Sequence, residues 1–349
     1  MTQPARRTGV VRPPAMVDVA RLSGVSQKTV SRVVNGEPHV SPGIQERVQA
    51  AIETLNFRPN SAARALASAR SRTIGFVSTG SALFGPTAIS AGVERAAREA
   101  GYSIAVAHTP DGTPASVRAA FGDLIGRGVE AIIVSEPADD LHPSELLSTG
   151  VPVLSLDNES ADFTDWITVG ADDRMAARTG TQHLIDLGHR SILHIAGPPG
   201  WATSQNRLLG YRDAVSAAGI PTCVELRGDW SVDSGFAAGH EIASRHDVTA
   251  VLAANDEMAI GAIRALQLAG LSVPKEVSVV GIDDIPVAAY LAVPLTTIRQ
   301  DFEVIARSGM ARLIDAIEGR ALTSRQHAVP TELVIRDTTA PPPARAPHL

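Results

Sequence analysis

The chain has 349 residues, and its charge is divided unevenly about a formal net charge of −6. Residues 1–70 contain 10 Lys and Arg against 4 Asp and Glu, a net of +6, which leaves −12 for the remaining residues. A basic N-terminal part suits a phosphate-bearing partner, and an acidic remainder excludes a chain that binds nucleic acid along its whole length. The single cysteine, Cys223, excludes an internal disulfide. The lack of a signal core or a membrane-length apolar run predicts a soluble cytoplasmic protein without a membrane partner.

Two short helices around a tight turn are predicted by residues 17–35, VDVARLSGVSQKTVSRVVN. Gly24 permits the turn, and Ser26 is a suitable N-cap for a helix that begins at Gln27. The apolar positions recur at helical spacing and are Ala20, Val25, Val30 and Val33. The second helix exposes side chains suited to base edges and phosphates, namely Gln27, Lys28, Ser31 and Arg32. This pattern predicts a helix-turn-helix, and the alternative is a solvated amphipathic helix pair in an unrelated bundle.

A third helix is expected to start at Pro42 and to end at Phe57 and Pro59. Its apolar positions, which can close a small three-helix core, are Ile44, Val48, Ile52 and Leu55. Residues 60–71, NSAARALASARS, are good helix formers with an Asn cap at the start, but Leu66 is almost their only apolar residue. Such a segment cannot fold alone, so its helicity should depend on DNA, on a partner subunit or on both.

From Thr73 onward, short β-branched runs alternate with amphipathic helices. Strands are expected in TIGFVS, YSIAVAH, AIIVS, VPVLSLD, SILHIAG, AVLAAND and VSVVGID. Helices are expected at about 86–100, 115–127, 172–187, 204–218, 233–245, 256–269 and 302–318. The alternation predicts an α/β core of doubly wound parallel sheets, and the Pro- and Gly-rich joins favour two lobes with a ligand cleft between them. A single large Rossmann-type enzyme is the alternative.

Six motifs in the expected order resemble the lactose repressor family of bacterial transcription factors. They are MVDVARLSGVSQKTVSRVVNGEPHVSP, FRPNSAARALASARSRTIGFV, LGHRSILHIAG, VLAANDEMAIGAIRAL, VSVVGIDDIP and PLTTIRQDF, which span about residues 16–338. ALFGPT at 82–87, NRLLGY at 206–211 and GDWS at 228–231 are most similar to the galactoside-responsive members. The resemblance implies a homodimer whose paired helix-turn-helix heads bind near-palindromic, double-stranded operator DNA. Hinge helices would join these heads to a two-lobed core of periplasmic-binding-protein type.

The resemblance implies a division of the chain and a set of DNA-contacting residues. The parts are a disordered tail at 1–14, a helix-turn-helix domain at 15–59, a hinge at 60–71, an effector-binding and dimerisation core at 72–339, and a disordered tail at 340–349. Lobe 1 covers about 72–169 and 301–328, and lobe 2 about 170–297 and 329–339. The implied DNA contacts are Ser26, Gln27, Lys28, Thr29, Ser31, Arg32 and Asn35, with Asn60 and Leu66 in the hinge. Gln27 and Lys28 fall where the family reads bases, and Leu66 falls on the hinge leucine that wedges into the minor groove.

The resemblance also implies that the core binds a small-molecule effector. The matching positions are Leu83, Phe84, Asp157, Arg207, Trp230, Asn255, Asp283, Gln300 and Phe302. Two carboxylates, a guanidinium fork, an amide and a flat aromatic face form a set that suits a sugar. Since the chain has few aromatic residues to sandwich a purine, we expect a neutral, galactoside-like sugar that releases a repressor from its operator. Asp256, which follows Asn255, is expected to cap a helix.

Other functions remain as alternatives. They are a sugar-transport receptor, a regulator that uses a non-sugar effector as co-repressor, and an α/β sugar enzyme. Neither a metal nor another cofactor is expected, because His183, His189 and His194 are spread over a helix, a turn and a strand, and GPPG at 197–200 lacks a dinucleotide fingerprint. Catalysis is not expected, because no nucleophile–base pair is evident.

The chain departs from the family at both ends. Ala15 stands where family members commonly have Thr, which removes a hydroxyl able to cap the first helix and should weaken the head modestly. At the other end the chain reads PPPARAPHL where one member of the family continues into a leucine-rich tetramerisation helix, so a dimer is expected.

Overall fold

The structure is a computed structural model that describes residues 12, 14–34, 36–58, 70–109, 113–135, 150–156, 166–222, 225–245 and 247–343. Two compact units divide the chain, Met1–Ser71 and Arg72–Leu349, and we call them the head and the core. Four of the predicted site residues lie outside the described residues: Asn35, Asn60, Leu66 and Asp157. The predicted hinge helix at 60–71 lies almost wholly outside them as well, so it stays a prediction.

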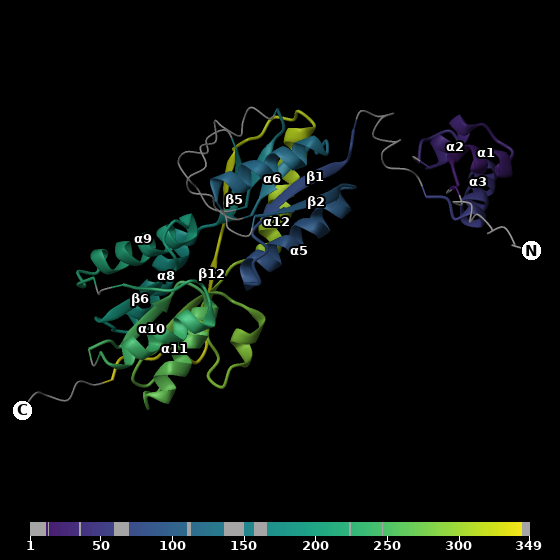
Figure 1. Ribbon diagram of the computed structural model, residues 1–349. Helices are drawn as coiled ribbons and strands as arrows, with labels where there is room; N and C mark the ends of the chain where they lie inside the picture. The colour runs from purple at the N-terminus through teal and green to yellow at the C-terminus, as the bar shows by residue number, and fades with distance from the viewer. Residues whose placement is uncertain are drawn as a thin grey trace, which may run out of the picture. The chain divides into compact units, whose positions relative to one another are not determined.

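Three helices form the head, α1 (Met16–Ser23), α2 (Gln27–Val34) and α3 (Pro42–Leu55) (Figure 1). Gly24 makes the turn between α1 and α2 with a left-handed φ of 67°, which a residue without a Cβ adopts without strain. The Ser26 hydroxyl caps α2 by accepting the Thr29 N–H at 3.2 Å. The side chains that the three helices bury completely between them are Val19, Val30 and Val48. The predicted helix-turn-helix and its third helix are therefore confirmed.

The third helix ends differently from the prediction. Asn56 adopts a left-handed φ of 46° directly after Leu55, and the Phe57 N–H turns back to the Ile52 carbonyl at 2.9 Å. This geometry satisfies a carbonyl group at the helix end, and the Phe57 side chain is buried in the head core. Asn56 is thus the helix terminator, while Phe57 is a core residue.

Two six-stranded sheets form the core (Figure 1). The first has the strand order β11-β5-β4-β3-β1-β2, and the second has the order β12-β10-β9-β8-β6-β7. The strands of the first sheet are β1 (Thr73–Ser78), β2 (Ser103–His108), β3 (Ala131–Val134), β4 (Val153–Ser155), β5 (Ile167–Ala171) and β11 (Gln326–Val329). The strands of the second sheet are β6 (Ile192–Ala196), β7 (Leu226–Arg227), β8 (Ala250–Ala253), β9 (Ser278–Asp283), β10 (Thr296–Arg299) and β12 (Glu332–Val334).

Helices cover both faces of each sheet, and we call each sheet with its helices a lobe. In the first lobe, α5 (Phe84–Glu99) and α12 (Phe302–Ile317) cover one face and α6 (Pro114–Gly126) covers the other. In the second lobe, α10 (Val232–Ala243) and α11 (Asp256–Leu268) cover one face, and α8 (Asp173–Asp186) and α9 (Ala202–Ala217) cover the other. The predicted doubly wound core is therefore confirmed. Among the described helices, none has the length and apolar character needed to cross a membrane.

Five strands escaped the sequence patterns, namely β5, β7, β10, β11 and β12. Several of them lie where the chain passes between the lobes: it leaves the first lobe after β5, returns after β10 and crosses again between β11 and β12. β10 ends at this junction with Arg299, and β12 begins beside it at Glu332. Because β12 starts where β10 ends, it runs antiparallel to β10. The second sheet therefore has one antiparallel edge strand that the pattern of parallel units did not predict.

The C-terminal segment is packed beyond the predicted end of the core at residue 339. The Thr338 hydroxyl accepts the Thr296 N–H at 2.8 Å and donates to the Val279 carbonyl at 2.7 Å. The Ala340 N–H donates to Ser278 Oγ, and the Ser278 hydroxyl donates back to the Ala340 carbonyl, both at 3.0 Å. The expectation that a disordered tail begins at Ala340 is therefore wrong for that residue, because its backbone groups complete the edge of the second lobe.

Candidate functional site

The head presents one side of α2 to solvent. Its exposed side chains include Gln27, Lys28 and Arg32, and its half-buried ones include Thr29 and Ser31. The Ser26 and Thr29 hydroxyl oxygens lie 2.9 Å apart, so these two residues stiffen the start of α2. Gln27 and Lys28 occupy the first two positions of the helix and extend beyond this cap. They carry the hydrogen-bonding groups that can reach base edges in a major groove.

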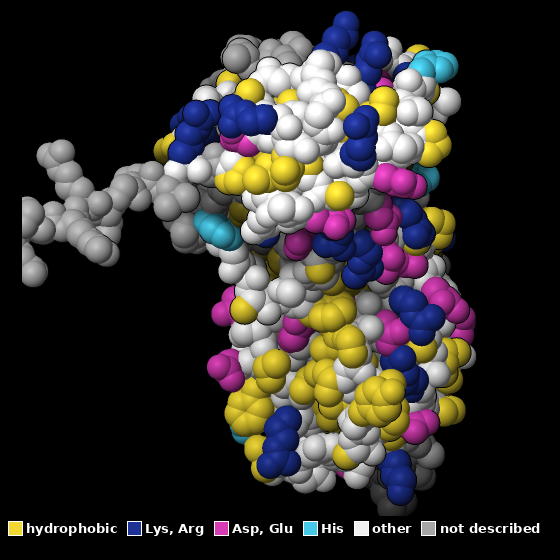
Figure 2. Space-filling model, turned by 90° about the vertical axis from the view of Figure 1, so that its right-hand side faces the viewer, with side chains coloured by type: hydrophobic (Ala, Val, Ile, Leu, Met, Phe, Trp, Pro, Cys, Tyr) yellow, Lys and Arg dark blue, Asp and Glu magenta, His cyan; other side chains and the backbone are white. Residues whose placement is uncertain are grey.

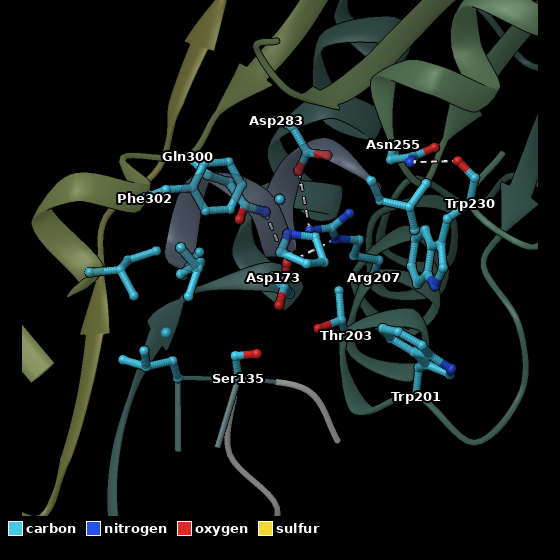
Figure 3. Close-up of a pocket in the computed structure, with 18 of the residues that line it drawn as sticks. Ser135, Asp173, Trp201, Thr203, Arg207, Trp230, Asn255, Asp283, Gln300 and Phe302 are labelled. Atoms are coloured by element: carbon cyan, nitrogen blue, oxygen red, sulfur yellow. Dashed lines mark hydrogen bonds and ion pairs between the residues drawn. The ribbon is translucent and has the colours of Figure 1, made fainter. Parts of the chain in front are cut away.

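A cavity of about 730 Å³, part of it open to solvent, lies between the two lobes of the core (Figure 3). Its lining includes residues at the carboxyl ends of strands from both sheets, namely Ser135, Leu156 and Ala171 from the first lobe and Asn255, Asp283 and Gln300 from the second. In open α/β sheets, ligands bind at these strand ends. The three passages of the chain between the lobes therefore bring two such sheet edges to one space.

Seven of the nine predicted effector positions line this cavity: Leu83, Arg207, Trp230, Asn255, Asp283, Gln300 and Phe302. Phe84 is not among the lining residues. Its ring meets that of Phe302 edge to face, with the ring centroids 5.8 Å apart, so it supports a lining residue from behind. Asp157 lies outside the described residues.

A buried cluster centred on Arg207 forms the polar wall of the cavity (Figure 3). Arg207 Nε donates to Asp173 Oδ1 at 2.8 Å, and Nη1 donates to the Ala254 carbonyl. Nη2 lies 3.5 Å from Asp283 Oδ1, and Gln300 Nε2 donates to the same Asp173 oxygen at 3.1 Å. The guanidinium is thus held by protein groups on several sides. Arg207 also lines the cavity, so its predicted contact with a ligand stays a prediction.

Asp283 and Trp230 hold unusual backbone conformations in this wall. Asp283 has a φ of 125° and Trp230 a φ of 74°, values that residues with a Cβ rarely adopt. Such strain persists where surrounding packing enforces it, and it clusters at ligand sites. Burial raises the pKa of the Asp283 carboxyl well above its usual range, while Arg207 opposes that rise. The raised pKa favours the protonated form, which can donate as well as accept a hydrogen bond.

Asn255 caps α11, in place of the predicted cap Asp256. The Asn255 side-chain carbonyl accepts the Met258 N–H at 3.0 Å. Its amide donates to the Trp230 carbonyl and to Glu257 Oε2, both at 2.9 Å. The side chain is therefore engaged on both its oxygen and its nitrogen, and it links the helix to the strained segment that carries Trp230.

Asp256 is fully buried behind the cavity wall. It accepts the Thr297 hydroxyl at 2.5 Å and the Ile285 N–H at 2.8 Å. Burial raises the pKa of its carboxyl to about 7, since these two hydrogen bonds offset the cost of burying the charge only in part. Asp256 thus ties α11 to β10 and to the loop after β9.

Aromatic and aliphatic groups form the rest of the lining. The aliphatic and aromatic side chains that the first lobe contributes include Leu83, Pro86, Ile89, Phe302 and Ile305. Trp201 and Trp230 meet edge to face, with ring centroids 5.8 Å apart. Gly197 is required beside them, because a Cβ there would lie 2.3 Å from the Trp230 ring. The cavity therefore combines hydrogen-bonding groups with flat hydrocarbon surfaces, which suits a molecule with polar edges and C–H faces.

Sequence reasoning missed several lining residues, among them the polar or aromatic residues Asp173, Trp201, Thr203 and Glu257. Asp173 escaped because the strand before it, β5, was not predicted. The adjacent pair Asp172 and Asp173 could have indicated it, because a helix needs only one N-cap. Asp172 caps α8 by accepting the Met175 N–H at 2.9 Å, and Asp173 is buried. Within the described residues, no group of three His, Cys, Asp or Glu side chains is arranged to hold a metal ion.

Comparison with known proteins identifies both parts of the chain. Residues 15–60 match the model of the bacterial regulatory proteins of the lacI family. Residues 181–339 match a periplasmic binding protein-like domain. The chain is 36% identical to the lactose operon repressor of Escherichia coli over 335 residues, which cover 95% of this chain and 92% of that protein. It is also 36% identical to the HTH-type transcriptional regulator CelR of Thermobifida fusca, over 94% of this chain and 98% of that protein.

Solved structures of lacI-family regulators match nearly the whole chain. The structure of the Lac repressor bound to ONPG in the repressed state matches with a TM-score of 0.87 at 35% identity, over 94% of this chain and 100% of that one. The CelR–cellobiose complex matches with a TM-score of 0.70 at 33% identity, over 93% of this chain and 99% of that one. The helix-turn-helix head, the periplasmic-binding-protein-like core and these matches together show that the chain belongs to the lacI family of bacterial regulatory proteins and is a DNA-binding transcriptional regulator.

Proposed function

We propose that this regulator represses sugar-utilisation genes and that a small neutral sugar releases it from its operator. The observation that carries the proposal is the buried cluster of Asp173, Arg207 and Asp283 beside Trp230. Carboxyl oxygens suit sugar hydroxyls, and an indole face suits sugar C–H groups. The names of relatives support the same ligand class, since they include lactose and ribose operon repressors and a CelR–cellobiose complex.

The charges in the cavity favour a neutral effector over an anionic one. Three of the described lining residues are acidic, Asp173, Glu257 and Asp283, and Arg207 is the single Lys or Arg among them. Arg207 is already engaged by two of those acids, so a phosphorylated sugar would meet carboxyl groups without a new cationic partner. A galactoside is our specific choice, on the strength of the GDWS segment that contains Trp230.

The head supplies the DNA-binding half of the proposal. Gln27 and Lys28 read bases of a near-palindromic operator, and the remaining predicted contacts of α2 position the helix on phosphates. Leu66, in the predicted hinge, inserts between central base pairs. A regulator of this kind acts in the cytoplasm and needs no catalytic activity.

A homodimer is proposed because an apolar surface lies on the second lobe. In Figure 2, hydrophobic side chains gather on the lower half of the face shown. The exposed large hydrophobic residues of this lobe include Val232, Leu268, Val287 and Tyr290. Val232 lies in a groove that Phe236, Ile260 and Leu291 also line. Contiguous exposed apolar patches often mark interaction sites, and a Lac repressor dimer has been solved on its operator.

The test combines DNA selection with calorimetry on the full chain. Fragments of genomic DNA retained by purified protein would be sequenced with and without a panel of a galactoside, a glucoside, a purine base and a phosphorylated sugar. We expect a near-palindromic site whose retention falls when the galactoside is present. Trp201→Ala should weaken galactoside binding by about tenfold through loss of ring contact, and Trp201→Phe should restore most of it.

The outcomes separate the competing functions. Release by the purine base or by the phosphorylated sugar alone would contradict the neutral-sugar proposal but keep the regulator. Tighter retention in the presence of any ligand would identify a co-repressor. Turnover of a sugar without DNA retention would support an enzyme instead.

A further inference from the structure

Glu257 joins the two lobes at the edge of the cavity. It occupies the second position of α11 in the second lobe. Its Oε1 accepts the backbone N–H of Phe84 from the first lobe at 3.1 Å, and its Oε2 accepts the Asn255 amide at 2.9 Å. We propose that Glu257 is a positioning residue, which holds α5 of the first lobe against the second lobe and transmits the occupancy of the cavity to α5.

The first lobe needs this carboxylate because α5 lacks a cap of its own. Leu83 occupies the N-cap position and makes no side-chain hydrogen bond to the helix. The first backbone N–H groups of a helix have no partner within it, and Glu257 accepts one of them from across the cavity. Its negative charge lies at the N-termini of both α5 and α11, where the partial positive charge of each helix stabilises it.

Asn255 connects this contact to the ligand space. Its amide donates both to Glu257 and to the Trp230 carbonyl, and all three residues line the cavity. A sugar hydroxyl that accepts from the same amide competes with Glu257 for that donor. The Glu257 carboxylate then reorients, and its bond to the Phe84 N–H weakens. This step rests on the proposed function, whereas the contact between the lobes does not.

A shift at the start of α5 is carried into the first lobe by close packing. A Cβ at Gly92 on α5 would lie 2.8 Å from the Ala306 Cβ on α12, so the two helices approach each other closely there. Leu83 and Phe84 pack against the hydrophobic core of the second lobe. The beginning of α5 is therefore held by both lobes, and it follows β1, the strand that continues directly from the head.

Variants on each side of the contact isolate its effect. Glu257→Ala removes both acceptors, and Glu257→Gln keeps one of them. Phe84→Pro removes the N–H at the first position of α5, where proline is tolerated and where the preceding residue already has an extended ψ of 153°. Phe84→Ala loses the ring but keeps the N–H, so it is the reference for Phe84→Pro. Glu241→Ala is the matched control, because it removes an exposed carboxylate that pairs with Arg245 elsewhere in the second lobe.

The first measurement needs no effector. Hydrogen exchange of the amides at the start of α5, followed by mass spectrometry of the full-length protein, should quicken about tenfold in Glu257→Ala, and less in Glu257→Gln. Tenfold corresponds to about 1.4 kcal/mol, near the lower limit for a hydrogen bond to a charged group. Glu241→Ala should leave exchange unchanged. Equal exchange in wild type and Glu257→Ala would overturn the proposal, whatever the effector proves to be.

The second measurement is the factor by which saturating galactoside weakens operator binding. This factor should fall three- to tenfold in Glu257→Ala relative to wild type, and by a similar amount in Phe84→Pro relative to Phe84→Ala. The double variant, Glu257→Ala with Phe84→Pro, should lose no more than the larger of the two single losses. Losses that multiply in the double variant would overturn the proposal. The proposal would also be overturned if Glu257→Ala bound galactoside far more weakly while saturating galactoside still weakened operator binding by the wild-type factor. Glu257 would then only contact the ligand. If no sugar weakens operator binding by the wild type, the proposed function fails and the exchange result alone decides the role of Glu257.

Discussion

Arg207→Ala should destabilise the core strongly, because it would strand two buried carboxyl groups. The Arg207 side chain is 6% exposed, and those of Asp173 and Asp283 are 5% and 8% exposed. Removing one partner of a buried ion pair costs about 3–5 kcal/mol, since the remaining charge stays buried without compensation. We therefore expect the free energy of unfolding of the core to fall by about 3–5 kcal/mol at pH 8.

This loss should be smaller in acid. Burial raises the pKa of Asp283 and Arg207 opposes the rise, so in the variant the pKa of Asp283 rises further. A carboxyl with a raised pKa in the folded state binds a proton there more tightly than in the unfolded chain, so its contribution to stability declines as the pH rises towards the folded pKa. Protonation of the Asp283 carboxyl relieves the stranded charge more fully at pH 5 than at pH 8. The difference between variant and wild type should therefore grow from pH 5 to pH 8.

Urea unfolding followed by tryptophan fluorescence measures this effect in the core alone, because Trp166, Trp201 and Trp230 all lie there. Arg245→Ala is the control, since its pair with Glu241 is exposed and should contribute less than about 1 kcal/mol. The reasoning is refuted if Arg207→Ala costs no more than Arg245→Ala at pH 8, or if its cost is larger at pH 5 than at pH 8.

Four further outcomes are expected. The free energy of unfolding of the wild type should decline between pH 4 and pH 7, because the pKa of Asp256 is raised to about 7 in the folded state and its buried charge is costly above that pH. In Asp256→Asn this decline should be smaller, and urea midpoints at pH 5 and pH 8 check it. Gly261→Ala should lower the thermal midpoint of the core, because the new Cβ would lie 2.0 Å from the Val232 carbonyl oxygen, and an unchanged midpoint would contradict the packing of α10 on α11. Ala15→Thr should stabilise the head by about 0.5–1 kcal/mol, because α1 has no side-chain cap, as circular dichroism of full-length protein at the head transition can show. Gln27→Ala or Lys28→Ala should relax discrimination at one operator base by about 1–3 kcal/mol; a uniform loss on all DNA would mean that the side chain contacts phosphate.

Local patterns in the sequence determined the head. The spacing of Ala20, Val30 and Val48, the turn at Gly24 and the cap at Ser26 act within about thirty residues, so their consequences can be read along the chain. Local patterns also predicted the long helices of the core and its buried strands, because strands buried on both faces read as continuous apolar runs. Motif order then identified seven of the residues that line the cavity.

Tertiary structure alone decided how those residues are used. Arg207 lines the cavity as the motifs predicted. Its pairing with Asp173 was not predicted, because that pairing depends on β5, a strand too weakly patterned to predict, and on a crossing between the lobes. The choice between Asn255 and Asp256 as the cap of α11 depends on residues from a different part of the chain. The Thr297 hydroxyl and the Ile285 N–H donate to the Asp256 carboxylate, so Asn255 caps the helix instead. The bond between Glu257 and Phe84 joins residues 173 positions apart. Periodicity reports which face of an element is buried, whereas the partner of a buried polar group is set by the three-dimensional crossing of elements, which no local pattern contains.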